Sequence, residues 1–246
     1  MPKRARLDQT LVQRGFFGSR HQAQAAIMAG EVSVDGRRAI KASETVPEES
    51  QIAIAARNRY VGRGGLKLEG ALTHFHISCK DNVALDIGAS TGGFTDCLLQ
   101  HGARKVFAVD VGHGQLAWKI RRDPRVVALE KTNARYLSRA EIAEPIELCV
   151  IDVSFISLTL VLPSVFDLLT PDGVILALIK PQFELAREDV GRGGVVRDPV
   201  LHAHAQQKVA TFAEKIGAHV AGIVPSAITG ADGNQEFFIC LRKPSA

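Results

Sequence analysis

The stretch that decides the fold reads Leu85-Asp86-Ile87-Gly88-Ala89-Ser90-Thr91-Gly92-Gly93-Phe94-Thr95-Asp96. It has the pattern of the end of an apolar strand, a glycine-rich turn and the start of a helix. Its glycines permit positive φ angles and let a ligand approach the backbone closely. Turns of this kind bind nucleotide-like ligands at the carboxyl ends of strands.

Three classes of ligand can be compared on this turn. A P-loop has the form G-x-x-x-x-G-K-[ST]. Gly88, Gly93 and Thr95 fit that form, but Phe94 stands where a lysine would hold the phosphates. A dinucleotide fingerprint, G-x-G-x-x-G, is broken by Ala89-Ser90. A ligand without a pyrophosphate is the third class.

Polar residues at the neighbouring strand ends favour that third class. Asp86 would repel a pyrophosphate but can bind an ammonium, such as the one on the amino acid tail of S-adenosylmethionine. Asp110 ends the next predicted strand, where an acid can accept both ribose hydroxyls. Asn133 follows the third strand and can bond to the adenine edge. The alternative is a glycine-rich packing turn with two capping acids.

The series resembles the S-adenosylmethionine site of class I methyltransferases. The resemblance implies that S-adenosylmethionine is the cofactor and S-adenosylhomocysteine the product. The cofactor contacts that we predict are Asp86, Gly88, Ala89, Ser90, Gly92, Gly93, Phe94, Asp110 and Asn133.

From residue 66 onward, apolar runs alternate with helical patterns, which is typical of a parallel sheet covered on both faces. The predicted strands are Val83–Ile87, Lys105–Val109, Val126–Leu129, Leu148–Ile151, Val174–Ile179, His219–Val224 and Phe237–Leu241. The last two lie close together along the chain, so an antiparallel edge is open to them. The predicted fold class is α/β, a doubly wound, Rossmann-like sheet of class I methyltransferases with a small N-terminal α+β domain.

The first 46 residues have a pattern of their own. Leu7 and Leu11 have helical spacing, Ser19 can cap a second helix that ends at Gly30, and Asp35-Gly36 is a hairpin turn after an alternating strand. Basic residues are spread over this module. Without further information it could bind DNA, RNA or protein.

The module resembles the small RNA-binding domain named after a small-subunit ribosomal protein, the S-four domain. The strings that carry the resemblance are Arg6-Leu7-Asp8, Leu11-Val12-x-Arg14-Gly15, Ser19-Arg20, Ala23, Ile27 and Gly30-x-Val32-x-Val34-Asp35-Gly36. We predict RNA contacts from Arg6, Arg14, Ser19, Arg20, Arg37 and Lys41 in this domain, and from Arg63 beyond it.

The placement of charge suits either a polyanionic partner of the N-terminal module or a plain solvated surface. The net charge is +4, and the whole excess lies in the first 60 residues. No apolar run is long enough to span a membrane, and the four cysteines are scattered as buried thiols of a reducing cytosol would be. We expect a cytoplasmic protein with domains at 1–46 (RNA-binding) and 63–246 (methyltransferase), joined by a linker at 47–62, and no metal site.

Four charged residues stand where this fold exposes side chains to a substrate. Lys67 precedes the first predicted helix of the large domain, Asp152 and Lys180 end the fourth and fifth strands, and Glu236 stands at the edge of the last strand. Each taken alone could form a structural ion pair. Together they suit transfer to a ribose 2′-hydroxyl, which must lose its proton.

A free lysine is a poor base at neutral pH, but partial burial and a second cation nearby would lower its pKa. We therefore expect Lys180 to be the general base and Lys67 the neighbouring cation that steadies the alkoxide. Asp152 and Glu236 would orient the lysines and the hydroxyl.

This set resembles the Lys-Asp-Lys-Glu tetrad of the FtsJ-type 2′-O-ribose methyltransferases. With the N-terminal module, the chain is similar to the TlyA family over nearly its full length. The supporting strings are Gly62-Arg63-Gly64-Gly65-Leu66-Lys67-Leu68, Ile151-Asp152-Val153-Ser154-Phe155, Lys180-Pro181-Gln182-Phe183-Glu184 and Gly233-Asn234-Gln235-Glu236-Phe237. The resemblance implies methylation of ribosomal RNA at cytidines, with ribosomal subunits as partners. Residues 57–60 differ from the tetrapeptide of some TlyA proteins, which leaves the role of that linker open.

Other readings remain at this point. A base N-methyltransferase would carry Asp/Asn-Pro-Pro-aromatic after the fourth strand, and Asp152-Val153-Ser154-Phe155 lacks both prolines. TlyA relatives often bear the name haemolysin, but no segment of this sequence supports insertion into a membrane. The polar stretch from Glu184 to Asp198 is expected to be a mobile loop that closes on RNA, or a plain surface loop.

Overall fold

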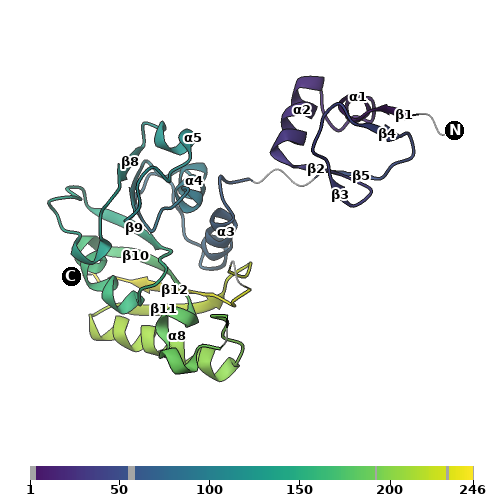
Figure 1. Ribbon diagram of the computed structural model, residues 1–246. Coiled ribbons are helices and arrows are strands. Elements are labelled where there is room, and N and C mark those ends of the chain that lie inside the picture. Colours follow the sequence, from purple (N-terminus) through teal and green to yellow (C-terminus); the bar gives the residue numbers. More distant parts are fainter. Residues whose placement is uncertain (1–3, 55–58, 192, 231–232, 246) are drawn as a thin grey trace. The chain divides into compact units, whose positions relative to one another are not determined.

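The computed structural model describes residues 4–54, 59–191, 193–230 and 233–245 (Figure 1). The chain divides into two compact units, Met1–Arg59 and Tyr60–Ala246. Among the described residues, the large unit has two hydrophobic clusters and the small unit has one. The division at Arg59 lies inside the stretch 47–62 that the sequence assigned to a linker.

The small unit begins with two helices, α1 (Leu7–Gln13) and α2 (Arg20–Ala29). The Ser19 hydroxyl caps α2 by accepting the backbone N–H of Gln22 at 3.3 Å, as the sequence predicts. Gly30 ends α2 with φ +74°, a left-handed conformation that glycine adopts without a steric cost. Leu7, Leu11 and Ile27 are fully buried between the helices and the strands.

Two small sheets complete this unit. The strands β2 (Val32–Val34), β3 (Arg37–Arg38) and β5 (Ile52–Ile54) form one, in the order β3-β2-β5, and β1 (Arg4–Arg6) pairs with β4 (Thr45–Pro47) in the other. Because β5 pairs with β2, the small unit extends beyond residue 46, where the sequence placed the end of the domain.

The large unit is built on a seven-stranded sheet in the order β11-β12-β10-β9-β6-β7-β8. Its strands are β6 (Val83–Ile87), β7 (Lys105–Val109), β8 (Val126–Leu129), β9 (Ile146–Ile151), β10 (Leu169–Ile179), β11 (His219–Pro225) and β12 (Phe237–Arg242). Every strand predicted from the sequence is present, and β12 runs antiparallel to both of its neighbours.

Helices cover both faces of this sheet, because its strands are apolar on both sides (Figure 1). The helices α3 (Gly64–His74), α4 (Gly93–Gln100) and α5 (Trp118–Arg121) share one hydrophobic cluster with one face of the sheet, and α6 (Leu162–Leu168) and α8 (Pro199–Lys215) share another with the opposite face. The remaining elements are the short helix α7 (Pro181–Glu184) and the 3₁₀ turns η1 (Ala134–Tyr136), η2 (Leu158–Leu160) and η3 (Arg187–Asp189). All four cysteines are buried.

The strand order fixes where a ligand can enter. From β6 the chain moves outward to β7 and β8, then returns to β9 on the other side of β6. The connections leave β6 and β9 in opposite directions and open a crevice at their carboxyl ends. Asp86 lies near the carboxyl end of β6, and Asp152 directly follows β9.

Candidate active site

The glycine-rich turn passes close to the end of β9. Gly88 has φ +83°, and a Cβ atom there would lie 2.3 Å from the carbonyl oxygen of Asp152. Gly92 has φ +94° and leads into α4. Glycine suits both positions, because it adopts a positive φ angle readily and has no Cβ atom to collide with the neighbouring chain.

Asp86 is fully buried next to the turn. Its Oδ2 accepts a hydrogen bond from the Thr95 hydroxyl at 2.6 Å, whereas its Oδ1 has no hydrogen-bond partner among the described residues. Burial, together with the negative charges of Asp152 and Asp110, raises the pKa of Asp86 to about 7, although the hydrogen bond from Thr95 acts in the opposite direction. A buried carboxylate oxygen without a partner fits the ammonium of an amino acid tail.

A cavity of about 370 Å³ opens over the carboxyl ends of β6, β7, β8 and β9. Asp110 lines it, and its two oxygens accept the backbone N–H groups of Ser90 (2.8 Å) and Gly112 (2.7 Å). Asn133 also lines it, and its Oδ1 caps η1 by accepting the N–H of Arg135. The apolar walls and polar rim suit a nucleoside.

A smaller hollow of about 140 Å³ joins the turn to the start of α3. It is lined by Gly62, Arg63 and Gly64 together with Gly88, Ala89, Ser90, Thr91, Gly93, Phe94 and Asp152. The Phe94 side chain itself is 4% exposed and packs on Phe238 in the core, with the ring centroids 6.1 Å apart. It therefore does not line the larger cavity.

The first of two lysine–carboxylate pairs lies at the ends of β9 and β10. The Nζ of Lys180 is 2.6 Å from the Oδ1 of Asp152 and donates to the Ser154 hydroxyl at 3.0 Å. Lys180 is only 9% exposed. Ser154 was not singled out in the sequence, since a lone serine after a strand has no distinctive spacing.

The second pair joins α3 to the start of β12. The Nζ of Lys67 donates to the Oε2 of Glu236 at 2.5 Å, and both residues are buried. Lys67 does not precede the first helix of the large unit, as the sequence suggested, but lies inside α3, which begins earlier at Gly64. The antiparallel register of β10 on β12 pairs Ile179 with Phe237. Lys180, one residue after Ile179, and Glu236, one residue before Phe237, therefore stand at the same end of this strand pair.

An aromatic side chain stands exposed beside the first pair. Phe155 is 91% exposed, has φ +63° and lies 5.0 Å from the ring of Phe183, centroid to centroid. A phenylalanine held in the left-handed region at the surface is a strained and unusual arrangement that marks functional sites. The sequence string that contains Phe155 was noted, but not this conformation.

Glu184 was predicted to begin a loop that is either mobile or a plain surface loop, but the structure places it in a buried, hydrogen-bonded position. It is 3% exposed, and it accepts hydrogen bonds from the Ser157 hydroxyl at 2.5 Å and the Leu158 N–H at 2.7 Å. Lys208 of α8 lies 3.5 Å from it. Farther along, Val196 and Gly194 are hydrogen-bonded to the Asn234 side chain. Residue 192, which belongs to this predicted loop, lies outside the described residues.

The predicted RNA contacts of the small unit fall into two groups. Arg6 and Arg20 each lie 3.0 Å from Asp8, and these guanidinium groups hold the pKa of the buried Asp8 well below its usual range. Arg14 donates to the carbonyls of Ser50 and Glu48.

The other group is open to solvent. Arg37 and Lys41 are exposed and line one shallow hollow together with Arg4. In the large unit, Arg63 donates to the carbonyl of Thr229 at 3.2 Å. Of the RNA contacts predicted for the small unit, Arg37 and Lys41 therefore have exposed side chains.

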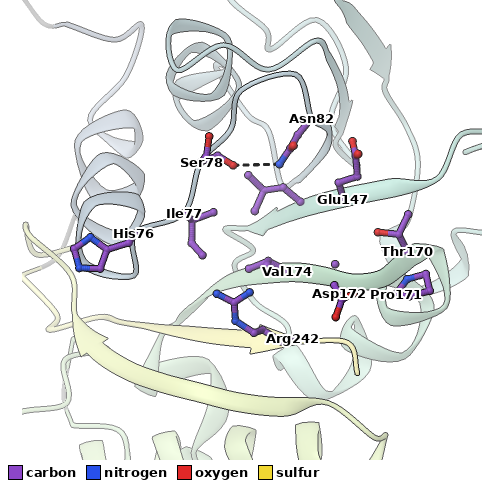
Figure 2. Close-up of a pocket in the computed structure, with 12 residues that line it drawn as sticks. His76, Ile77, Ser78, Asn82, Glu147, Thr170, Pro171, Asp172, Val174 and Arg242 are labelled. Carbon is purple, nitrogen blue, oxygen red and sulfur yellow. Dashed lines mark hydrogen bonds between the residues drawn. The ribbon is translucent and has the colours of Figure 1, made fainter. Parts of the chain in front are cut away.

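A further hollow of about 530 Å³ lies at the opposite edge of the large sheet (Figure 2). Its lining includes Glu147 near the start of β9, Val174 of β10 and Arg242 at the end of β12, and Asn82 donates there to the carbonyl of Ser78 at 3.2 Å. None of the predicted site residues lines it. The chemistry-bearing residues are gathered at the other edge.

Comparisons with known proteins bear on the same residues. The model of the FtsJ-like methyltransferase family matches residues 60–243, and that of the S4 domain matches residues 5–52. YqxC of Bacillus subtilis, which carries an rRNA methyltransferase name, is 48% identical over 98% of this chain and 87% of its own. The 16S/23S rRNA (cytidine-2′-O)-methyltransferase TlyA of Mycobacterium tuberculosis is 46% identical over 98% of this chain and 91% of its own.

A solved structure is also similar to this chain over its full length. A Streptococcus thermophilus protein that carries a hemolysin name superimposes with a TM-score of 0.77 and 43% identity, covering 100% of this chain and 90% of its own. Among the described residues, no helix is both long enough and apolar enough to cross a membrane.

Proposed function

Since the chain belongs to the FtsJ-like methyltransferases, and within them to the TlyA proteins, we propose that it methylates the ribose 2′-hydroxyl of a cytidine in ribosomal RNA. S-adenosylmethionine is the methyl donor. The observation that carries the proposal is the two lysine–carboxylate pairs, Lys180–Asp152 and Lys67–Glu236, beside the glycine-rich turn.

The cofactor has a defined place in this proposal. Asp86 binds its ammonium through the carboxylate oxygen that lacks a partner, and the Gly88–Gly93 turn holds its amino acid tail. Asp110 accepts the ribose hydroxyls, because each of its oxygens keeps a lone pair beyond its backbone bond. Asn133 faces the adenine. When bound, the cofactor supplies a methyl group on a sulfonium, which is already activated for transfer.

Several side chains of the protein take part in removing the proton of the ribose 2′-hydroxyl. Lys180, as the neutral amine, would accept the 2′-hydroxyl proton while that oxygen takes the methyl group from the sulfonium, which leaves as the neutral thioether, and Asp152, 2.6 Å away, would stabilise the lysine ammonium that forms. Ser154 keeps the Lys180 amine turned into the crevice. Lys67, held by Glu236, provides the cation that steadies the developing negative charge.

The acceptor enters from the exposed side of this set. Phe155 presents a free aromatic face beside Lys180, and aromatic faces stack unpaired bases of RNA. The small unit is the RNA-binding domain, and the exposed Arg37 and Lys41 contact phosphates. Ribosomal subunits are the partners, which places the reaction in the cytoplasm.

The proposal is tested by radiolabelled methyl transfer to isolated ribosomal subunits, followed by alkaline hydrolysis. A 2′-O-methyl group blocks cleavage, so the label should appear in alkali-resistant dinucleotides. Lys180→Ala should lower single-turnover transfer by about 10²- to 10⁴-fold, the usual contribution of a general base.

The matched control is Lys215→Ala, an exposed lysine in the last turn of α8, which should transfer methyl groups like the wild type. Label in mononucleotides would instead indicate base methylation. Equal transfer by Lys180→Ala and the wild type would reject Lys180 as the base.

A further inference from the structure

The only tryptophan of the sequence, Trp118, lies on the surface of the large unit with 69% of its area exposed. Tryptophan is usually largely buried, because its ring gains more from leaving water than almost any other side chain. Packing in the protein core therefore does not explain why a tryptophan stands at the first position of α5.

A cation lies directly over this ring. The guanidinium carbon of Arg122 is 4.5 Å from the Trp118 centroid, within the range of a cation–π contact. The other cations of the segment have carboxylate partners: Lys119 pairs with Asp96, Arg121 with Glu130 and Arg125 with Asp123. Arg122 has no carboxylate partner among the residues that the structure describes. An uncompensated positive charge thus lies on an exposed aromatic face.

The pair is fixed beside the cofactor turn. The Ala117 N–H donates to the carbonyl of Thr91 at 3.0 Å. A Cβ atom on Gly92 would lie 3.2 Å from both Leu116 and Ile120, which shows how closely the segment packs on the turn. The flanking residues therefore hold Trp118 in place although its ring is free.

Neither Trp118 nor Arg122 belongs to the catalytic set. They do not line the cofactor cavity, whose nearest contributors from this segment are Val111 and Gln115. They make no contact with Lys180 or Lys67 among the interactions of the described residues. Their loss should therefore affect binding of a partner more than the chemical step.

We infer that the Trp118–Arg122 pair is a second RNA-binding surface, one on the catalytic unit itself. The indole stacks an unpaired base outside the methylated nucleotide, and Arg122 binds the adjoining phosphate. Aromatic rings accept any base by stacking, and an arginine beside the ring adds both charge and a planar contact. This inference rests on the proposed function for its choice of RNA as the partner.

The first test is steady-state methylation of isolated ribosomal subunits. Trp118→Ala should raise KM for the subunits by about tenfold and leave kcat within about twofold. Trp118→Phe should recover most of the affinity, because it keeps an aromatic face. The matched control for Arg122→Ala is Arg242→Ala, which removes the same charge at the opposite edge of the sheet and should behave like the wild type.

The second test uses the single tryptophan as its own probe. A single-stranded oligoribonucleotide is titrated into the full chain saturated with S-adenosylhomocysteine, with binding followed independently by anisotropy of a labelled strand. Stacking should quench the tryptophan emission in parallel with binding, and added salt should reverse both. Unchanged emission during saturable RNA binding would overturn the inference.

The remaining outcomes are also decisive. Equal KM values for Trp118→Ala, Arg242→Ala and the wild type would overturn it, as would a change of sedimentation in Trp118→Ala, which would indicate a protein interface. Failure of the wild type to methylate any subunit would reject the proposed function instead. The quenching titration still tests the surface in that case.

Discussion

At the scale of single residues, Asp86 couples cofactor binding to protons. Its pKa of about 7 means that the ligand-free protein holds a proton there at lower pH, whereas an ammonium ligand requires the ionised form. Affinity for S-adenosylmethionine should thus fall by up to tenfold per pH unit below about pH 7.

Calorimetry in buffers of different ionisation enthalpy should detect the proton released on binding. Asp86→Asn should bind more weakly and lose the pH dependence. Methylthioadenosine, which lacks the ammonium, serves as the control ligand, and its affinity should not follow this titration. The same slope for both ligands would contradict the assignment.

Gly88 gives a second prediction at this scale. Gly88→Ala meets two obstacles, a left-handed backbone and a Cβ atom 2.3 Å from the Asp152 carbonyl oxygen. The backbone alone costs ~1–2 kcal/mol. Gly217→Ala is the matched control, since Gly217 has φ +89° with open space around it.

Both variants should lose thermal stability, but only Gly88→Ala should weaken S-adenosylmethionine binding, by at least tenfold. Equilibrium dialysis with labelled cofactor measures the difference. Similar binding by the two variants would show that the close approach of the turn to Asp152 has no role in the cofactor site.

Candidate site residues could be predicted from the sequence where a polar residue or a glycine follows an apolar run at a predicted strand end. Gly88, Asp86 and Lys180 follow apolar runs at strand ends, where the fold leaves few alternatives. Ser154 and Glu184 could not be found in this way, because their roles depend on partners that come from other elements.

At the scale of elements, Glu184 joins three pieces of chain. It ends α7, caps the start of η2 and faces α8 through Lys208. The loop that carries Ser154 and Phe155 runs into this anchor. Glu184→Gln keeps the shape but weakens the acceptor, which should cost about 1–3 kcal/mol of unfolding free energy.

Because that loop supports Lys180, single-turnover transfer by Glu184→Gln should fall by about tenfold while S-adenosylmethionine affinity is retained. The exposed Glu188 of η3 provides the control variant, Glu188→Gln. A drop in cofactor affinity equal to the drop in rate would indicate general loosening of the fold instead.

Element prediction succeeded where the pattern was long. The strands β6, β7 and β8 have the predicted bounds, because runs of apolar residues ended by polar ones leave little freedom. The strands β1 and β4 have three residues each and pair across most of the small unit. Three residues show no periodicity, so only the tertiary structure reveals this pair.

At the scale of the whole molecule, the S4 domain and the methyltransferase domain lie in separate units of the chain. A chain that begins at Tyr60 retains the complete seven-stranded sheet and both of its cores. It should bind S-adenosylmethionine within about twofold of the full chain. Its KM for ribosomal subunits should rise by more than about tenfold, and the salt dependence of RNA binding should flatten, because phosphate contacts of the small unit are lost.

RNA-binding isotherms at several salt concentrations measure the salt dependence as the slope of the logarithm of the binding constant against the logarithm of the salt concentration. The double variant Arg37→Ala with Lys41→Ala, in the full chain, should reduce it by about two, one for each phosphate contact. A slope that is the same for the wild type and the double variant would place the phosphate contacts elsewhere.

The burial of all four thiols has a practical consequence. Burial raises the pKa of Cys79 to about 12 and that of Cys149 well above its ordinary value, so neither is present as a reactive thiolate at neutral pH. Alkylating reagents and mild oxidants should leave the native chain untouched. A single cysteine introduced on the surface can then carry a fluorophore or a cross-linker without removal of any native thiol, and the enzyme can be followed on ribosomal RNA in its natural sequence background.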